Sequence, residues 1–227
     1  MKNLTIALFG IATIALCSFA VMKVNTTDNT VNPKVYKKFL SKFDQVALPY
    51  TLAAKRPSTY AELENQNDNS NTQEQYLGGE FENILPEMQR GRYSRMGPDD
   101  FNAEVMLASN KNFDAIIYSR TPSFRGSKTY YVATFDKAGN RIKKAAVARV
   151  GYGRIEEARI SADLTIQVDQ FKIESSEEDT DNAKLSYHLE NSRTIIINPN
   201  GNIIESTNSD APTKQKKVQL LDLGMLD

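Results

Sequence analysis

The stretch that decides the fold is Thr129-Tyr130-Tyr131-Val132-Ala133-Thr134-Phe135-Asp136-Lys137-Ala138-Gly139-Asn140-Arg141-Ile142. Its first seven residues are rich in aromatic and β-branched side chains, which favour strands. Residues 136–140 then combine Asp, Gly and Asn in a tight connection. Because a second strand begins directly afterwards, the stretch predicts a β-hairpin.

Strand-favouring segments continue along the chain on both sides of this hairpin. They are expected at 101–107, 114–118, 145–150, 155–161, 164–173, 185–190, 193–198 and 203–206. Asn200-Gly201, between the last two, is a strong short hairpin signal. Within 164–173, Leu164 and Val168 share one parity whereas Phe171 has the other, so we expect a bulge near Asp169-Gln170.

The N-terminal region shows helical spacing instead. Asn32 is suited to cap a helix and Pro33 to occupy its first position. The pattern Thr59-Tyr60-Ala61-Glu62 is that of a capping box. Residues 81–88 carry apolar side chains at helical spacing. The first helix has an apolar stripe of the same kind, formed by Tyr36, Phe39, Leu40 and Phe43.

Short strands with short connections pair antiparallel, because parallel strands need long crossovers. The predicted fold is therefore α+β: a mostly antiparallel β meander, curved or partly closed, with short N-terminal helices packed on one face. A β-propeller is the rival fold, but about ten strands would make only two or three four-stranded blades, too few to close a ring.

The sequence divides into a signal peptide (1–20), a flexible tether (21–31) and one sheet-rich domain (32–206). Within the domain, a helical segment (32–98) precedes the β meander (99–206). A polar linker (207–217) leads to an apolar tail (218–227), which is expected either to dock back on the domain or to bind a partner.

The leader has three interpretations. Lys2 is followed by an uncharged run that contains Ser18-Phe19-Ala20, so signal peptidase is expected to cut after Ala20. Alternatively Cys17 is lipidated, although Leu16 is larger than the residue that usually precedes a lipidated cysteine. In the third interpretation, the run of about 20 residues stays in place as a membrane anchor. All three place the domain outside the cytoplasm, in the periplasm or outer envelope.

Composition excludes several classes of function. Removal of the leader takes Lys2 and no acid from 28 basic and 28 acidic residues, so no net positive charge attracts nucleic acid. Cys17 is the only cysteine and His188 the only histidine, which excludes zinc sites of the usual ligand types and a Cys-His nucleophile pair. Alternation along its strand places His188 on the solvent side. No cofactor is expected, and membrane contact is expected only through the leader or a lipidated Cys17.

Acidic residues suggest two kinds of site. The run 174–182 offers Glu177, Asp179 and Asp181 to a calcium ion, but its spacing does not match an EF-hand. A solvated acidic loop is the simpler interpretation. The pairs Asp99-Asp100 and Glu156-Glu157 would suit glycoside hydrolysis, but adjacent strand residues point to opposite faces, so neither pair acts as a unit. We therefore assign no catalytic residue.

Four tyrosines are candidates for a surface that binds a sugar or a peptide: Tyr118, Tyr130, Tyr131 and Tyr152. Tyrosine combines an apolar ring with a polar tip and so suits stacking as well as hydrogen bonding. The alternative is that these residues are ordinary half-buried members of the sheet.

Two stretches resemble a known group of proteins: Phe43-Asp44-Gln45-Val46-Ala47-Leu48-Pro49-Tyr50-Thr51-Leu52 after a leader, and 130–140 later in the chain. They are similar to uncharacterised exported proteins and lipoproteins of Bacteroidetes-type bacteria. The resemblance implies export and a sheet-rich fold, and it keeps lipidation of Cys17 open. It assigns no activity.

The function expected from the sequence is that of a non-enzymatic binding or structural module of the cell envelope. Its partner would be a protein, a peptide or a glycan. The alternative is a carboxylate-dependent hydrolase that acts on envelope polymers.

Overall fold

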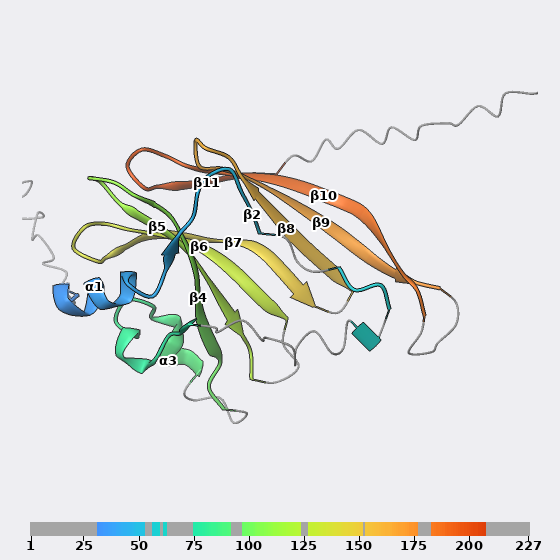
Figure 1. Cartoon of the computed structure of the whole chain (residues 1–227), viewed down its shortest axis with the longest axis horizontal. Coiled ribbons are helices and arrows are strands. Elements are labelled where there is room, and N and C mark those ends of the chain that lie inside the picture. Colours follow the sequence, from blue (N-terminus) through green and yellow to red (C-terminus); the bar gives the residue numbers. More distant parts are fainter. Residues whose placement is uncertain are drawn as a thin grey trace, which may run out of the picture.

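The computed structural model describes residues 31–52, 56–59, 61–62, 75–91, 97–123, 127–151, 153–176 and 183–207. The helical elements are α1 (Pro33–Leu40), the 3₁₀ turn η1 (Gly79–Phe81) and α3 (Glu87–Gly91). The strands are β1 (Asp44–Gln45), β2 (Tyr50–Leu52), β3 (Gln75–Tyr76), β4 (Asp100–Ser109), β5 (Asp114–Thr121), β6 (Lys128–Phe135), β7 (Arg141–Gly151), β8 (Arg154–Ile160), β9 (Thr165–Ser175), β10 (Leu185–Ile197) and β11 (Ile203–Thr207). Figure 1 shows their arrangement.

These strands form one 11-stranded sheet in the order β1-β4-β5-β6-β7-β8-β9-β10-β11, with β3 beside β4 and β2 beside β8. From β4 to β11 every neighbouring pair is antiparallel. The short pair of β1 with β4 is parallel. The structure thus confirms the predicted α+β meander, which is largely antiparallel and open. No helix of the described residues is long and apolar enough to cross a membrane.

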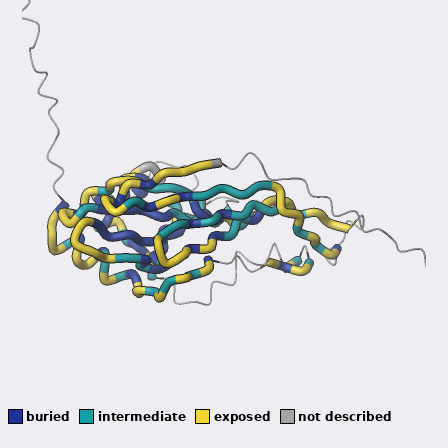
Figure 2. The backbone as a smooth tube through the Cα atoms, turned by 90° about the horizontal axis from the view of Figure 1, so that it is seen from above, coloured by how far each residue is buried: buried dark blue, intermediate teal, exposed yellow. Residues whose placement is uncertain are grey.

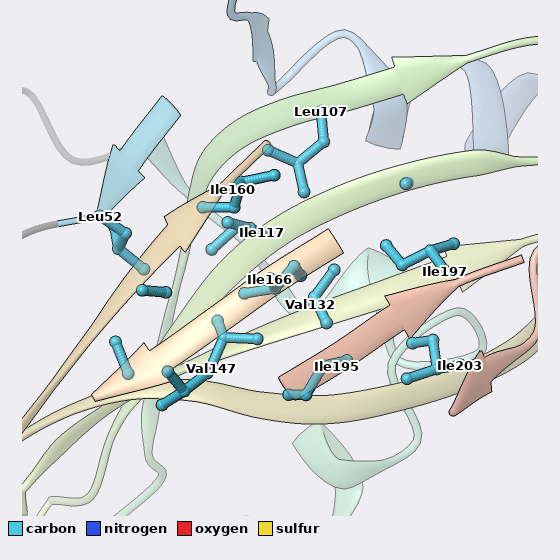
Figure 3. Packing of buried hydrophobic residues seen from close by; sticks show 14 of the residues in the cluster. Leu52, Leu107, Ile117, Val132, Val147, Ile160, Ile166, Ile195, Ile197 and Ile203 are labelled. Carbon is cyan, nitrogen blue, oxygen red and sulfur yellow. The ribbon is translucent and has the colours of Figure 1, made fainter. Parts of the chain in front are cut away.

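The long sheet folds over between β7 and β8. These strands pair only between residues 149–151 and 154–156, and β2 pairs with the remaining part of β8. As a result, the inner faces of β4–β7 and β8–β11 share one hydrophobic core, which we call the inner core. Figure 3 shows Ile117, Val132 and Val147 from the first half packed together with Ile166 and Ile195 from the second.

A second core, the outer core, lies on the opposite face of β4–β6 and is covered by α1, η1 and α3. Phe39 of α1 lies at its centre and contacts the rings of Phe43, Phe81 and Phe135 at centroid distances of 5.1, 5.4 and 5.7 Å. Figure 2 shows that buried residues gather at the end of the molecule that carries α1 and become sparse toward the far end of the β9–β10 hairpin. Aromatic packing therefore fixes the helices to the sheet.

The predicted start of the first helix is confirmed. The Asn32 side chain accepts a hydrogen bond of 2.9 Å from the Lys34 amide, and Pro33 opens the helix. The capping box is present in part, because Thr59 Oγ1 accepts from the Glu62 amide at 3.3 Å. A single helix over 81–88 does not form: η1 ends at Phe81, and α3 begins only after residue 86, a proline, which helix interiors exclude.

Two pairs of predicted strands are each one continuous strand. Segments 141–142 and 145–150 are both parts of β7. Segments 185–190 and 193–198 are joined in β10, which runs to Ile197. Polar residues between the apolar parts of these segments suggested a break, but the long strands continue because their neighbours supply backbone partners along their length.

The bulge expected in β9 lies instead in its partner β10, where the register shifts between Leu189 and Asn191. β9 keeps its alternation, and Phe171 therefore stays on the face opposite Val168. There it packs against the Arg56 guanidinium, 4.0 Å from the ring centroid. This contact gives Phe171 a partner on its own face, so no bulge in β9 is needed.

Candidate functional site

The candidate site begins with a bulge in β4. The register with β5 shifts between Ala103 and Val105, which leaves Glu104 as the extra residue. Ala103 packs in the outer core, whereas Val105 packs in the inner core. A bulge reorients the side chains around it, and here it directs the Glu104 carboxylate to the inner side, where Lys128 lies.

Glu104 and Lys128 form an ion pair between β4 and β6. Glu104 Oε1 lies 3.3 Å from Lys128 Nζ, and each side chain is 22% exposed. The Lys128 ammonium also lies 5.2 Å from the centroid of the Tyr130 ring, within the range of a cation–π contact. The pair is therefore partly withdrawn from water and has an aromatic ring beside it.

Tyr50 approaches this pair from β2. Its ring packs against the inner core. Its pKa lies above the ordinary value, first because of burial and second because of the nearby negative charge of Glu104. Both effects disfavour the phenolate, so the Tyr50 hydroxyl keeps its proton and stays able to donate a hydrogen bond.

Ser119 belongs to β5, the strand between β4 and β6. It pairs with Asn102 of β4 and with Tyr130 of β6, and it is completely buried. Its hydroxyl has no hydrogen-bond partner among the described residues. Leaving a buried hydroxyl unsatisfied costs about 1–3 kcal/mol.

One oxygen of the Glu104 carboxylate is unsatisfied in the same way. Its Oε1 atom is buried and accepts no hydrogen bond from the residues that the structure describes. Lys128 is close enough for an ion pair, but the approach is not aligned as a hydrogen bond requires. The two unsatisfied oxygens, on Ser119 and Glu104, come from the paired strands β5 and β4.

We call Tyr50, Glu104, Ser119, Lys128 and Tyr130 the interlayer cluster, because they come from the two facing halves of the sheet. Chemically it offers hydroxyl groups, one balanced acid–base pair and two aromatic rings. Convergent polar groups beside an apolar core are typical of ligand sites. Buried polar groups in proteins nearly always have a hydrogen-bond partner, so the unsatisfied Ser119 hydroxyl is the unusual feature of this cluster.

A second polar cluster, on the outer face, is fully satisfied. Glu87 of α3 accepts hydrogen bonds from Tyr118, from Arg141 at 2.5 Å and from Lys144 at 2.9 Å. Burial alone would raise the pKa of the Glu87 carboxyl, but these donors outweigh it and lower the pKa to about 2. Tyr131 stacks on Tyr118 with the ring centroids 5.4 Å apart. These contacts hold α3 against the sheet, and the Glu87 carboxylate already accepts hydrogen bonds from three side chains.

The four tyrosines proposed as one ligand surface do not share a face. Tyr118 is completely buried in the outer core with Tyr131 against it. Tyr130, the neighbour of Tyr131, lies on the opposite face and packs against the inner core. Adjacent residues of a strand point to opposite faces, which explains the division. Tyr152 lies outside the described residues.

The other sequence candidates that the structure describes hold structural contacts. His188 is 62% exposed, as the alternation along its strand predicts, and it lies 3.4 Å from Glu174. Three of the four acidic residues suggested for hydrolysis pair with arginines: Glu156 with Arg193 at 3.2 Å, Glu157 with Arg56 at 2.7 Å, and Asp99 with Arg120. Their carboxylates therefore hold the sheet and its connections together.

Several predictions fall on parts of the chain outside the described residues. They concern the calcium candidates Glu177, Asp179 and Asp181, the lipidation candidate Cys17 and the apolar tail 218–227. Within the described ranges, no group of three or more His, Cys, Asp or Glu side chains is arranged to hold a metal ion.

Tyr130 is the one member of the interlayer cluster that the sequence predicts as a ligand-binding residue. One signal pointed to another member, since Glu104 is the only charged residue in the strand segment 101–107. Tyr50, Ser119 and Lys128 carry no such signal, because each joins the cluster through strand pairing between distant segments. Comparison of the chain with protein families, with curated proteins and with solved structures finds no match.

Proposed function

We propose that the chain is an exported, non-enzymatic binding module of the cell envelope and that its ligand engages the interlayer cluster. The single observation that carries the proposal is the Ser119 hydroxyl, which is completely buried and has no hydrogen-bond partner in the part of the chain that the structure describes. A ligand that supplies the missing partner gains the hydrogen bond and also relieves an existing penalty.

Binding is favoured over nucleophilic catalysis by the same geometry. A serine nucleophile needs a general base within hydrogen-bond reach, whereas the described groups around Ser119 include none that accepts its proton. The Glu104 carboxylate is paired with Lys128 instead. These groups position a polar ligand without activating it.

Export is supported by the leader. Lys2, the uncharged run after it and the small residues Ser18 and Ala20 are typical of a secretory signal. Measurement of the intact mass of the protein, purified separately from membrane and soluble fractions of its own cells, tests this part of the proposal. Mature protein that begins at Val21, or a lipid on Cys17, supports export. Full-length protein confined to the cytoplasm contradicts it.

Cosedimentation with purified envelope polymers tests the binding site. The double variant Glu104→Gln, Lys128→Met removes the charges of the interlayer cluster but keeps the side-chain sizes. Its matched control is Lys172→Met, Glu174→Gln, which removes an exposed pair with a separation of 2.9 Å on β9. We expect the first variant to bind at least about tenfold more weakly, the effect of one lost hydrogen bond to a charged group. The control should bind like the unmodified chain, and equal binding by all three proteins overturns the proposed site.

A further inference from the structure

The charges of the interlayer cluster restrict the kind of ligand that it accepts. Glu104 and Lys128 carry opposite charges 3.3 Å apart, so these two side chains together add no net charge to the cluster. A charged group would also lose its hydration between the two halves of the sheet without a counter-charge of its own to compensate. A neutral, polar ligand avoids this penalty.

The hydrogen-bonding groups indicate which neutral ligand fits. Ser119 Oγ can both donate and accept, Glu104 Oε1 is a buried acceptor, and the Lys128 ammonium is a donor beside them. The cluster therefore contains both donors and acceptors. Ligand hydroxyl groups match such a set of partners, because each hydroxyl also donates one hydrogen bond and accepts others.

The two tyrosines supply the remaining part of the surface. Tyr130 and Tyr50 both pack against the inner core, and each combines an apolar ring with a hydroxyl tip. The ring of Tyr130 has the Lys128 ammonium 5.2 Å from its centroid. Lysine has a long, flexible stem, so its ammonium can move aside while a flat, C–H-rich ligand takes its place over the ring.

From these three features we propose that the interlayer cluster binds a neutral sugar residue of a glycan. The ring of the sugar stacks on Tyr130, and its hydroxyl groups bind Ser119 and Glu104. Lys128 moves from the ring and donates to the ligand while it stays near Glu104. This inference rests on the proposed function and specifies the chemical class of its ligand.

Isothermal titration calorimetry of the full chain tests the inference with defined probes. The neutral probes are maltotetraose and the tetramer of N-acetylglucosamine, the charged probe is tetragalacturonate, and the peptide probe is tetraalanine. We expect at least one neutral sugar to bind with saturation and the other two probes to give no saturable heat. Saturable binding of tetragalacturonate or tetraalanine without either neutral sugar overturns the sugar assignment.

Substitution of serine localises the binding. Ser119→Ala should weaken binding of the neutral sugar at least about fivefold, the effect of one lost hydrogen bond, whereas Ser186→Ala, at an exposed position of β10, should leave it unchanged. Equal affinity of both variants overturns the role of Ser119.

The calorimetry and the cosedimentation separate the two proposals. If no sugar probe binds but cosedimentation with envelope polymers still depends on Glu104 and Lys128, the sugar assignment is wrong and the proposed function stands. If both measurements are negative, both proposals are wrong.

Discussion

The carboxylate of Glu104 and the ammonium of Lys128 lie 3.3 Å apart and join β4 to β6 on the inner side of the sheet. Beside them Ser119 is completely buried. Glu104 and Lys128 are charged, whereas Val105 and Val132 of the same two strands pack in the inner core. The inner face of β4 and β6 thus changes from apolar to polar at this ion pair. We expect the ligand to bind there.

Replacement of Ser119 by alanine tests whether its hydroxyl is unsatisfied in the free protein. We expect the free energy of unfolding to stay the same or to rise by up to about 1 kcal/mol, because the variant no longer buries an unpartnered polar group. Urea denaturation followed by circular dichroism measures the change. Ser192→Ala is the matched control and should lose about 1 kcal/mol, since Ser192 Oγ donates to Asp169 at 2.7 Å. An equal loss in both variants would show that Ser119 has a partner.

Replacement of Glu87 by glutamine should destabilise the protein by about 2 kcal/mol. The variant loses the charge that accepts hydrogen bonds from Arg141 and Lys144, and such bonds to charged groups contribute about 1.5–3 kcal/mol. Glu80→Gln is the control: its carboxylate is exposed and lies 3.2 Å from Lys38, so the expected loss is below about 0.5 kcal/mol. Equal stability of the two variants in urea would contradict the role of Glu87 as the anchor of α3.

Acid should weaken the protein through the same carboxylate. The pKa of Glu87 is lowered from its ordinary value of 4.5 to about 2 in the fold. Its contribution is therefore complete above pH 4.5 and is lost as the pH falls toward 2, by roughly 3 kcal/mol in all. Urea denaturation at a series of pH values should show this loss in the unmodified chain and a flatter dependence in Glu87→Gln. Parallel pH profiles would contradict the lowered pKa.

Arg193 of β10 connects the two halves of the sheet. It donates to the Ala146 carbonyl of β7 at 3.0 Å and pairs with Glu156 of β8 at 3.2 Å. Arg193→Met should lower the free energy of unfolding by about 2 kcal/mol, because Glu156 loses its partner and a backbone carbonyl loses its donor. Hydrogen exchange should also become faster in β11, where Glu205 contacts Arg193 at 3.1 Å. Arg154→Met, which removes an exposed ion pair between β8 and β10, should change neither quantity.

The hairpins could be predicted because their signals are local. Gly139 and Gly201 both adopt positive φ angles, +88° and +81°, the backbone region that glycine enters without strain. A Cβ on Gly201 would also lie 2.7 Å from Ile142 Cδ1, so this turn packs closely against β7. In the first hairpin, the Asp136 carboxylate accepts hydrogen bonds from the backbone amides of residues 138 and 140. These features depend on a few neighbouring residues, and the sequence displays them.

The site could not be predicted in the same way because it depends on register. Residues 101, 103, 105 and 107 share one parity, yet the bulge at Glu104 divides them between the outer and the inner core. The expected bulge in β9 was wrong for a related reason: Phe171 has a partner on its own face, Arg56. Bulge positions follow from which faces the whole fold covers, and one segment of sequence does not contain that information.

Nuclear magnetic resonance of the ¹⁵N-labelled full chain identifies the residues that the ligand contacts. Solubilised envelope glycans are added, and the backbone amide shifts are followed residue by residue. We predict that the largest changes fall on the residues of the interlayer cluster. Ile196 and Ile204 form an exposed apolar pair directly opposite each other on β10 and β11. Changes confined to that pair, with none at the interlayer cluster, would show that the ligand does not bind the interlayer cluster.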